Sequence, residues 1–401
     1  MSRSFARGSW KNDRRRRHRG QSPIRSFGGA WLGLLVVVGG VDLSTPDAAF
    51  GAPGAVSLGG YQDESLVAGQ DLMGGGQIVV GWTDSFGAGD RDAWVLKLDA
   101  DGNPEWQRSY GGAGLDEAVF VEVVDTSNPD QGYLVVGVTE SFGAGGKDIW
   151  ALRLDEEGDV LWEKTYGGTG TDAPSMIAKE RLCFLPGDPL READWAIAGT
   201  TNSFGAGDFD AWLLRIDDAT GDLIWSRTYG SAAFAERANS VEATACGEWI
   251  LGSDTAAFGS ANGDFWLLKL DDVGDVEWEK LYGGTDFDAR PYVVQTDDDD
   301  DGSPDDGYLV AGLSYSWPAL GGVSSDVWVL KLDASGAIVW QAAFGTTSEE
   351  SVSGVGEDGN AFFVAGSSLD SLLLPSTGKG FFVKLSAAGV IEWAREFDGP
   401  D

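Results

Sequence analysis

The chain has 401 residues, 42% of them apolar, with 28 Lys+Arg against 64 Asp+Glu. That apolar fraction is enough for a large core, so the composition excludes a disordered chain. The formal net charge of −36 repels a phosphate backbone and excludes nucleic acid as a partner.

Residues 1–51 have the pattern of a secretory signal peptide. An arginine-rich stretch (14–17) precedes an apolar run from Ala30 to Val41, and the small residues Ala48, Ala49 and Gly51 follow. The apolar run is shorter than the roughly 20 residues of a spanning helix, although a membrane anchor is the alternative. We therefore predict cleavage, a secreted, periplasmic or cell-surface location, and no stable membrane insertion.

Cleavage would make the protein still more acidic. Residues 1–51 carry nine Lys+Arg and three Asp+Glu, which leaves 19 basic against 61 acidic side chains and a net charge of −42. A surface of this kind favours solubility or the binding of divalent cations.

The remaining residues, 52–401, repeat one pattern six times and are predicted to form a single domain. The segment from Asp92 to Gly112 returns from Asp148, and again from Asp210, Asp264 and Asp326, with a degraded copy from Gly380. Two aromatic series align across the copies: Trp94, Trp150, Trp212, Trp266, Trp328 and Phe382, and Trp106, Trp162, Trp225, Trp278, Trp340 and Trp393. The copies begin roughly 55 to 60 residues apart, and a repeat of this length indicates a solenoid or a propeller.

Within one copy the apolar residues alternate with period two, as strands require. Trp94–Asp99 is a predicted strand, and Asp99–Gly102 is a predicted hairpin turn that leads into a strand around Trp106. Upstream of the second copy, Ala118–Val124 and Tyr133–Thr139 are two further strands. Four strands per copy predict an all-β fold, a β-propeller of six four-stranded blades.

Two points of the architecture stay open. A seven-bladed ring that uses the N-terminal residues is the alternative, and Val56–Leu58 could add a closing strand. The two tryptophan series are expected to fill the wedges between blades, with an aromatic ligand platform as the other interpretation.

The turn Ile216–Trp225 resembles the tryptophan-docking motif of quinoprotein (PQQ-type) propellers. The matching residues are Asp217, Thr220, Gly221 and Trp225; the other copies keep the Gly and the Trp, and all but the sixth, which has Ser386, keep the Asp. The resemblance implies a propeller. Quinoprotein dehydrogenases place adjacent cysteines beside the cofactor, whereas Cys183 and Cys246 are far apart here, so no PQQ is expected. Export permits a disulfide between these two cysteines, and the sequence leaves it undecided.

The segment Asp297–Asp305 looks like the calcium loop of integrin-type propellers. Asp297, Asp299, Asp301 and Asp305, with Gly302, match D-x-D-x-D-G-x-x-D, in which alternate carboxylates converge on a hard cation. Tyr308 stands where an EF-hand has Glu, so that type of site is not expected. The four aspartates are the candidate Ca²⁺ ligands, and a solvated acidic loop is the alternative.

Two further acidic sets recur in register. One precedes the first aromatic series: Asp92, Asp148, Asp210, Asp264 and Asp326. We expect these to accept hydrogen bonds from their own glycine-rich loops, with a cation or sugar site as the alternative. The other set begins the first strand of each copy: Asp63, Asp116, Asp172, Glu236, Asp288 and Glu350. This second set would form an acidic rim around the channel mouth or would be solvated turn residues.

Catalysis lacks its usual groups, because the one histidine, His18, lies in the signal segment and no nucleophile elbow or phosphate loop is present. We therefore expect a monomeric, non-catalytic propeller that serves as a binding or scaffold module, stabilised by calcium. Its partner would be a protein, a polysaccharide or an envelope component. The alternative is a carbohydrate-active or lactone-cleaving enzyme that uses acidic residues at the channel mouth.

Overall fold

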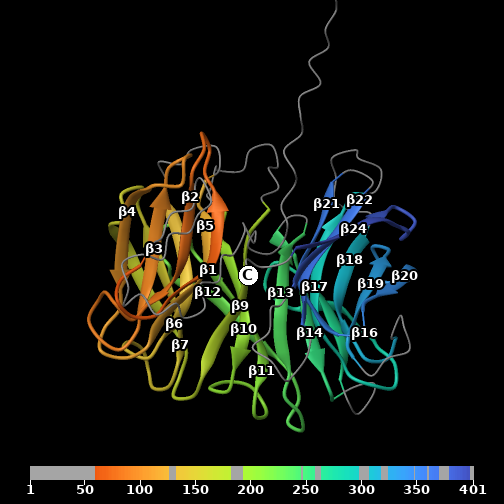
Figure 1. Ribbon diagram of the computed structural model, residues 1–401. Coiled ribbons are helices and arrows are strands. Elements are labelled where there is room, and N and C mark those ends of the chain that lie inside the picture. Colours follow the sequence, from red (N-terminus) through yellow and green to blue (C-terminus); the bar gives the residue numbers. More distant parts are fainter. Residues whose placement is uncertain are drawn as a thin grey trace, which may run out of the picture.

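The protein is an all-β propeller of six four-stranded antiparallel blades, as the repeat predicts. The computed structural model describes residues 59–125, 132–181, 193–244, 247–257, 263–297, 307–317, 324–346, 348–358, 361–369 and 379–397. Figure 1 shows the sheets following the chain around a common centre, from the orange first blade to the blue sixth. Within these residues no helix is long and apolar enough to cross a membrane.

Each blade is built from four consecutive strands. Blade 1 contains β1 (Glu64–Asp71), β2 (Gln77–Thr83), β3 (Asp92–Leu98) and β4 (Pro104–Tyr110). Blade 2 contains β5 (Asp116–Val123), β6 (Tyr133–Thr139), β7 (Asp148–Leu154) and β8 (Val160–Tyr166). Blade 3 contains β9 (Asp172–Lys179), β10 (Trp195–Thr201), β11 (Asp210–Ile216) and β12 (Leu223–Tyr229).

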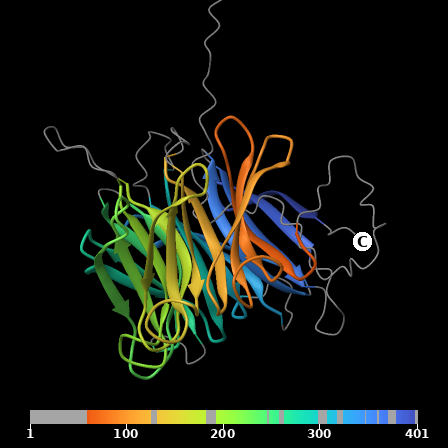
Figure 2. The same ribbon diagram turned by 90° about the vertical axis from the view of Figure 1, so that its left-hand side faces the viewer.

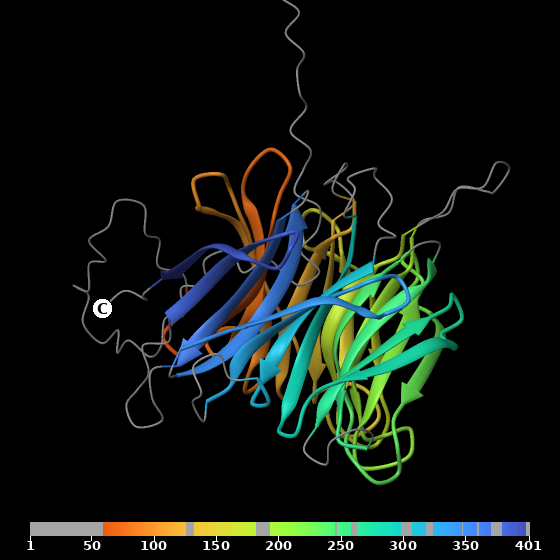
Figure 3. The same ribbon diagram turned by 90° about the vertical axis from the view of Figure 1, so that its right-hand side faces the viewer.

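The second half of the chain continues the same order. Blade 4 contains β13 (Arg237–Ala243), β14 (Trp249–Thr255), β15 (Asp264–Leu270) and β16 (Val276–Tyr282). Blade 5 contains β17 (Asp288–Thr296), β18 (Gly307–Ser314), β19 (Asp326–Leu332) and β20 (Ile338–Phe344). Blade 6 contains β21 (Glu349–Asp358), β22 (Ala361–Leu369), β23 (Lys379–Ser386) and β24 (Ile391–Phe397). Figures 2 and 3 show these sheets from the two sides.

The first strand of every blade is the inner strand. First strands contact the first strands of neighbouring blades along the chain, whereas the fourth strands lie on the outside. The third strands β7, β11, β15 and β19 are buried along their whole length, because a blade covers each face. The predicted turn Asp99–Gly102 is confirmed, and Gly102 has φ +80°.

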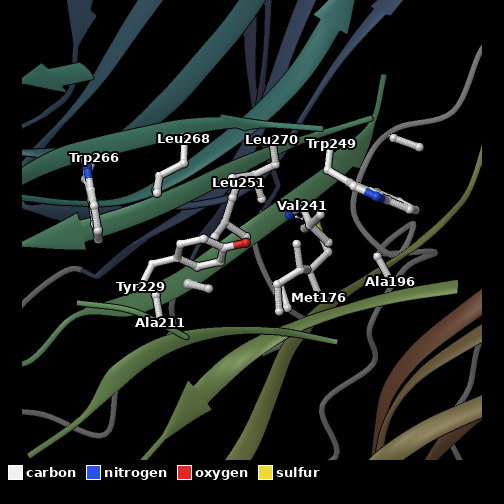
Figure 4. Close-up of a cluster of buried hydrophobic side chains, with 14 residues drawn as sticks. Met176, Ala196, Ala211, Tyr229, Val241, Trp249, Leu251, Trp266, Leu268 and Leu270 are labelled. Atoms are coloured by element: carbon white, nitrogen blue, oxygen red, sulfur yellow. Dashed lines mark hydrogen bonds between the residues drawn. The ribbon is translucent and has the colours of Figure 1, made fainter. Parts of the chain in front are cut away.

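Five apolar clusters form the core, and each one joins two successive blades. Figure 4 shows the cluster between blades 3 and 4, where Tyr229 of β12 lies beside Leu251 and Leu268 of blade 4. Both tryptophan series contribute to these clusters, so the prediction that they fill the wedges between blades is confirmed.

The outer-strand tryptophan makes a recurring contact, the blade joint, with the turn between the third and fourth strands of the next blade. Its indole N–H donates to the carbonyl of the second turn residue, for example from Trp162 to Asp218 at 3.0 Å. The tyrosine four residues later donates to the carbonyl of the turn glycine, as Tyr166 does to Gly221 at 2.6 Å. The same bonds start from Trp106, Trp225 and Trp340, and from Tyr110, Tyr229 and Tyr282.

The turn residue whose carbonyl accepts the tyrosine hydroxyl must be glycine for two reasons. Gly221 has φ +67°, which side chains rarely adopt, and a Cβ atom there would lie 2.7 Å from the ring of Trp162. The lysine or arginine two residues after the tryptophan then pairs with the carboxylate after the glycine, as in Lys164–Asp222 at 2.9 Å. The residues that resemble the tryptophan-docking motif of quinoprotein propellers therefore hold one blade to the next.

The joint is not made between blade 6 and blade 1 among the described residues. No described atom comes within 4 Å of a Cβ placed on Gly102, the turn glycine of blade 1. Trp393 is 37% exposed and packs instead on Phe363 and Phe382 of its own blade. Trp106 of blade 1 packs on Tyr133 of blade 2, which pairs with Leu154. The equivalent residue of blade 1, which would face Trp393, is Gln77, which pairs with Leu98 in the same register.

Blade 6 corrects one alignment made from the sequence. Lys384 pairs with Trp393 as Lys97 pairs with Trp106, so Phe381 and not Phe382 takes the place of Trp94. By the same register Lys379 stands where the other blades have the first-set aspartate. The repeat is degraded at this point, and the apolar run Phe381–Phe382 gave no signal that distinguishes the two positions.

The blade joint predicts unequal effects of two equivalent substitutions. Trp162→Ala should lower the free energy of unfolding by about 2–4 kcal/mol, because it opens a cavity and removes the bond to Asp218. Trp393→Ala should cost on the order of 1 kcal/mol, because its joint is not made. Urea denaturation measures both, and equal losses would contradict the inferred difference between the two interfaces.

Candidate functional site

The second acidic set does not form a rim. Asp116, Asp172, Glu236 and Asp288 are fully buried and Glu350 is 4% exposed, so neither the rim nor the solvated turn is correct. Asp116 accepts bonds from the Gly112 amide, the Ser141 hydroxyl and the Thr139 hydroxyl. These donors come from the loop before the strand and from the end of the second strand, and they draw the carboxylate into the interior.

In blade 1 the corresponding residue is Glu64 and not Asp63. Glu64 pairs with Thr83 as Asp116 pairs with Thr139, and its carboxylate accepts bonds from the Gly60 amide and the Thr83 hydroxyl. Two acidic residues stand side by side here, so the sequence alone did not fix which one occupies the repeated position.

The first acidic set behaves as expected. Asp92, Asp148 and Asp210 each accept a bond from the amide of the alanine in the preceding S-F-G-A-G loop, at 2.8–3.0 Å. Burial raises the pKa of each of these three carboxyl groups. These three residues therefore order their own loops, and the prediction of a structural role is confirmed for them, whereas the loops before Asp264 and Asp326 lie partly outside the described residues.

Three of the four candidate calcium ligands, Asp299, Asp301 and Asp305, lie outside the described residues. Asp297 lies just after β17, and its backbone amide donates to both carboxylate oxygens of Glu357 in the next blade at 3.1 Å. No group of three or more His, Cys, Asp or Glu in the described ranges is placed to hold a metal ion. Cys183 and Cys246 also fall outside these ranges, so their pairing stays a prediction.

Exposed aromatic side chains gather at one end of the blades, which we call the aromatic face. It is formed by the loops between second and third strands and by the connections between blades. Its exposed rings are Tyr61, Phe86, Phe142, Phe204, Phe234, Phe287 and Trp317. The S-F-G signature in the first three copies is the sequence signal for part of this set, although the sequence did not show that the rings would be exposed.

Four of these rings recur at one repeated position and are held in place from below. Phe86, Phe142, Phe204 and Trp317 pack on the buried third-strand tryptophan of their own blade, with centroids 5.4–6.3 Å apart. Each nevertheless exposes 39–46% of its surface. The aromatic face is thus rigid on its inner side and apolar toward solvent.

A charged cluster lies at the other end of the inner strands. It comprises Gln70 on β1, Glu122 on β5, Lys179 on β9, Arg181 just after β9, and Glu242 on β13. Gln70 donates to Glu122 at 3.0 Å, and Arg181 pairs with Glu242 at 2.9 Å. The charge of Glu242 acts on Glu122 although blade 3 lies between their two blades, so both side chains lie toward the axis.

Burial raises the pKa of both carboxyl groups of this cluster. Burial, and to a smaller extent the charge of Glu242, raises the pKa of Glu122 to about 7, against the opposing effects of Gln70 and Lys179. Burial also raises the pKa of Glu242, which Arg181 opposes. The sequence signal for these residues is a glutamate within an apolar inner strand, at V-F-V-E-V and again at S-V-E-A, and it is not among the acidic sets predicted from the sequence.

No protein-family model matches the chain, and no curated protein matches it. Among solved structures, the chain is similar to quinohemoprotein alcohol dehydrogenase from Pseudomonas putida, with 11% identity, a TM-score of 0.41, and coverage of 76% of this chain and 56% of that one. For the enzyme from Comamonas testosteroni the values are 12%, 0.40, 84% and 60%. For the Synechocystis apocarotenoid oxygenase they are 14%, 0.40, 77% and 69%. This chain therefore spans less than two thirds of the length of either dehydrogenase, and similarity at this level assigns no activity.

Glu122 should make stability depend on pH. Its pKa in the folded protein lies above the value of about 4.3 in an unfolded chain, so the folded state holds the proton longer. The free energy of unfolding should fall as pH rises from about 4 to about 7, by on the order of 2 kcal/mol from this group. Glu122→Gln should remove that part of the slope in urea denaturation, while Glu157→Gln, at an exposed turn, should leave it unchanged. Equal slopes in wild type and Glu122→Gln would contradict the assignment.

Proposed function

We propose that this chain is an exported, non-catalytic binding module whose partner docks on the aromatic face. The observation that supports this is the gathering of exposed rings at one end of the blades, four of them at one repeated position. Exposed apolar patches of this kind are typical of interaction surfaces.

The contacts beneath the rings favour binding over mere exposure. Phe142 and Phe204 rest on Trp150 and Trp212 at 5.7 and 5.4 Å, so their side chains lose little conformational freedom when a partner covers them. Rigid aromatic anchors are the groups that contribute most to binding at protein interfaces. They also stack on the apolar faces of sugar rings, so the partner is a protein or a polysaccharide of the envelope.

We also propose that Ca²⁺ stabilises the loop that begins at Asp297. Asp297, Asp299, Asp301 and Asp305 supply alternate carboxylates, and Gly302 permits the sharp turn that such a loop needs. The bond from the Asp297 amide to Glu357 attaches the first of these residues to blade 6. The cation would then have a structural role at the face opposite the aromatic one.

The aromatic face can be tested by a triple substitution. Phe86→Ser, Phe142→Ser and Phe204→Ser together should reduce capture of the partner at least about tenfold, because three anchors are lost. The matched control is Leu223→Ser with Ile338→Ser, which removes exposed apolar side chains from outer strands. The measurement is a glycan array and an envelope pull-down, each with CaCl2 and with EDTA. Equal loss in the control, or capture unaffected by the triple substitution, would refute the docking site.

A second candidate function rests on Glu122 and Glu242. A carboxyl group whose pKa lies near 7 can act as a general acid at neutral pH, and a second carboxylate nearby completes the pair that carbohydrate-active or lactone-cleaving enzymes need. Lys179 and Arg181 beside them could hold an anionic part of a substrate.

Turnover of a panel of glycosides and lactones tests this candidate. Glu122→Gln and Glu242→Gln should each lower kcat by about 10² or more, whereas Glu157→Gln should not. The wild-type kcat should fall above about pH 7, where Glu122 loses its proton. Turnover that persists in Glu122→Gln, or no turnover of any compound, would leave binding as the function.

A further inference from the structure

Each of the five interfaces from blade 1 to blade 6 contains a pair of buried carboxyl groups. One acid begins the third strand of a blade, and the other begins the inner strand of the next blade. The pairs are Asp92 with Asp116, Asp148 with Asp172, Asp210 with Glu236, Asp264 with Asp288, and Asp326 with Glu350. None of the ten residues is more than 4% exposed.

Backbone contacts bring the two acids together. The amide of Asp116 donates to the carbonyl of Arg91, the residue before Asp92, at 2.8 Å, and the amide of Asp172 donates to Lys147 at 2.7 Å. Gly111 lies between the first pair, with Asp92 Oδ1 and Asp116 Oδ2 2.1 and 2.8 Å from the point where its Cβ would stand. The second pair has the same arrangement over a glycine, at 1.8 and 2.7 Å. The two carboxyl groups of a pair therefore face each other.

In the first two pairs the two acids differ in their hydrogen bonds. Asp116 accepts three, and its Oδ2 takes the Gly112 amide at 2.7 Å and the Ser141 hydroxyl at 2.6 Å. Asp92 accepts the Ala88 amide on Oδ2, whereas its Oδ1 is buried and has no hydrogen-bond partner within the described chain. Asp148 Oδ1 is in the same condition in the next interface. In these two pairs the inner-strand acids Asp116 and Asp172 are thus stabilised as carboxylates, whereas one oxygen of the third-strand acid has no donor among the described residues.

Among the described residues, the charged groups around the first two pairs are engaged with other partners. The Arg91 guanidinium bridges Asp84 at 3.1 Å and Glu117 at 2.6 Å, with its other face over Trp82. In the next interface the corresponding cation, Lys147, lies 3.7 Å from Glu140. Two neighbouring carboxyl groups in a buried site cannot both ionise at little cost. A proton or a metal ion between the two groups removes that cost.

We propose that each of the first two pairs, Asp92 with Asp116 and Asp148 with Asp172, shares one proton, which the third-strand acid carries and donates through its Oδ1 to Oδ2 of the inner-strand acid. These two pairs then act as latches that hold blade 2 to its neighbours at acidic pH and weaken as the pH rises. In the Asp92 and Asp148 carboxyl groups, burial and the charge of the facing acid raise the pKa, in agreement with this arrangement. Blade 6 has Lys379 at the corresponding position, so the sixth interface has no such pair.

The sign of the pH dependence follows from the raised pKa. The folded protein keeps protons that the unfolded chain releases near pH 4, so the latches contribute fully below that pH. Their contribution is lost as the pH rises through the folded-state pKa. Asparagine in place of the third-strand aspartate keeps a donor toward the inner-strand carboxylate at every pH, and should therefore remove the dependence without breaking the contact.

Thermal unfolding of the full chain in EDTA, from about pH 5 to about pH 9, tests the proposal. The wild-type Tm should fall across this range, and Asp92→Asn with Asp148→Asn should reduce the fall by ~1–3 °C per pair. The control Asp90→Asn, exposed in the same loop as Asp92, should leave the fall unchanged. Infrared absorption should show protonated carboxyl groups at neutral pH in the folded wild type, and fewer of them in the double variant.

Three results would overturn it. The first is a double variant that is as sensitive to pH as the wild type. The second is a double variant whose Tm is lowered by the same amount at every pH, together with no infrared signal from protonated carboxyl groups. The third is a wild-type Tm that CaCl2 restores at high pH while the double variant does not respond, which would assign the pairs to a metal ion.

Discussion

The structure depends on the contact between the outer-strand tryptophan of one blade and the hairpin turn of the next. The indole N–H of Trp162 binds a turn carbonyl, its ring covers Gly221, and the neighbouring Tyr166 and Lys164 bind the same turn. Without this contact each four-stranded sheet would leave its apolar faces in water, because a single sheet of this size cannot bury both faces. The repetition of the residues along the chain is a direct consequence, since every blade has to present both halves of the contact.

This constraint explains where function can lie. The glycine-rich loops, the third-strand aspartates and the inner-strand acids are all occupied with holding loops and interfaces, so they offer little to a ligand. What remains are side chains that the blade joint does not use: the exposed rings of the aromatic face, and the polar residues near the axis, such as Glu122 and Glu242. These lie at opposite ends of the inner strands, so binding and any acid–base chemistry would use different faces.

Much of the fold could be predicted because the repeat is local. The alternation in W-V-L-K-L-D and the turn D-A-D-G fixed strand and turn bounds within a residue or two. The candidate site was less accessible. Asp116 and Asp92 were recognised as repeated acids, but an acidic residue at a strand end is exposed or buried according to which donors surround it. Those donors include Ser141 and Thr139, which lie more than 20 residues from Asp116 in the chain.

The sequence by itself determined the blade unit, its turns and the number of copies, since these follow from short-range alternation and from glycines with fixed backbone requirements. Only the tertiary structure decided which acids face each other across an interface, which rings are exposed, and that Phe381 rather than Phe382 takes the tryptophan position. The same holds for the interface between blades 6 and 1, where Gly102 and Trp393 do not meet among the described residues. The physical reason is that burial, pairing of charges and register in a degraded copy depend on neighbours distant in the chain.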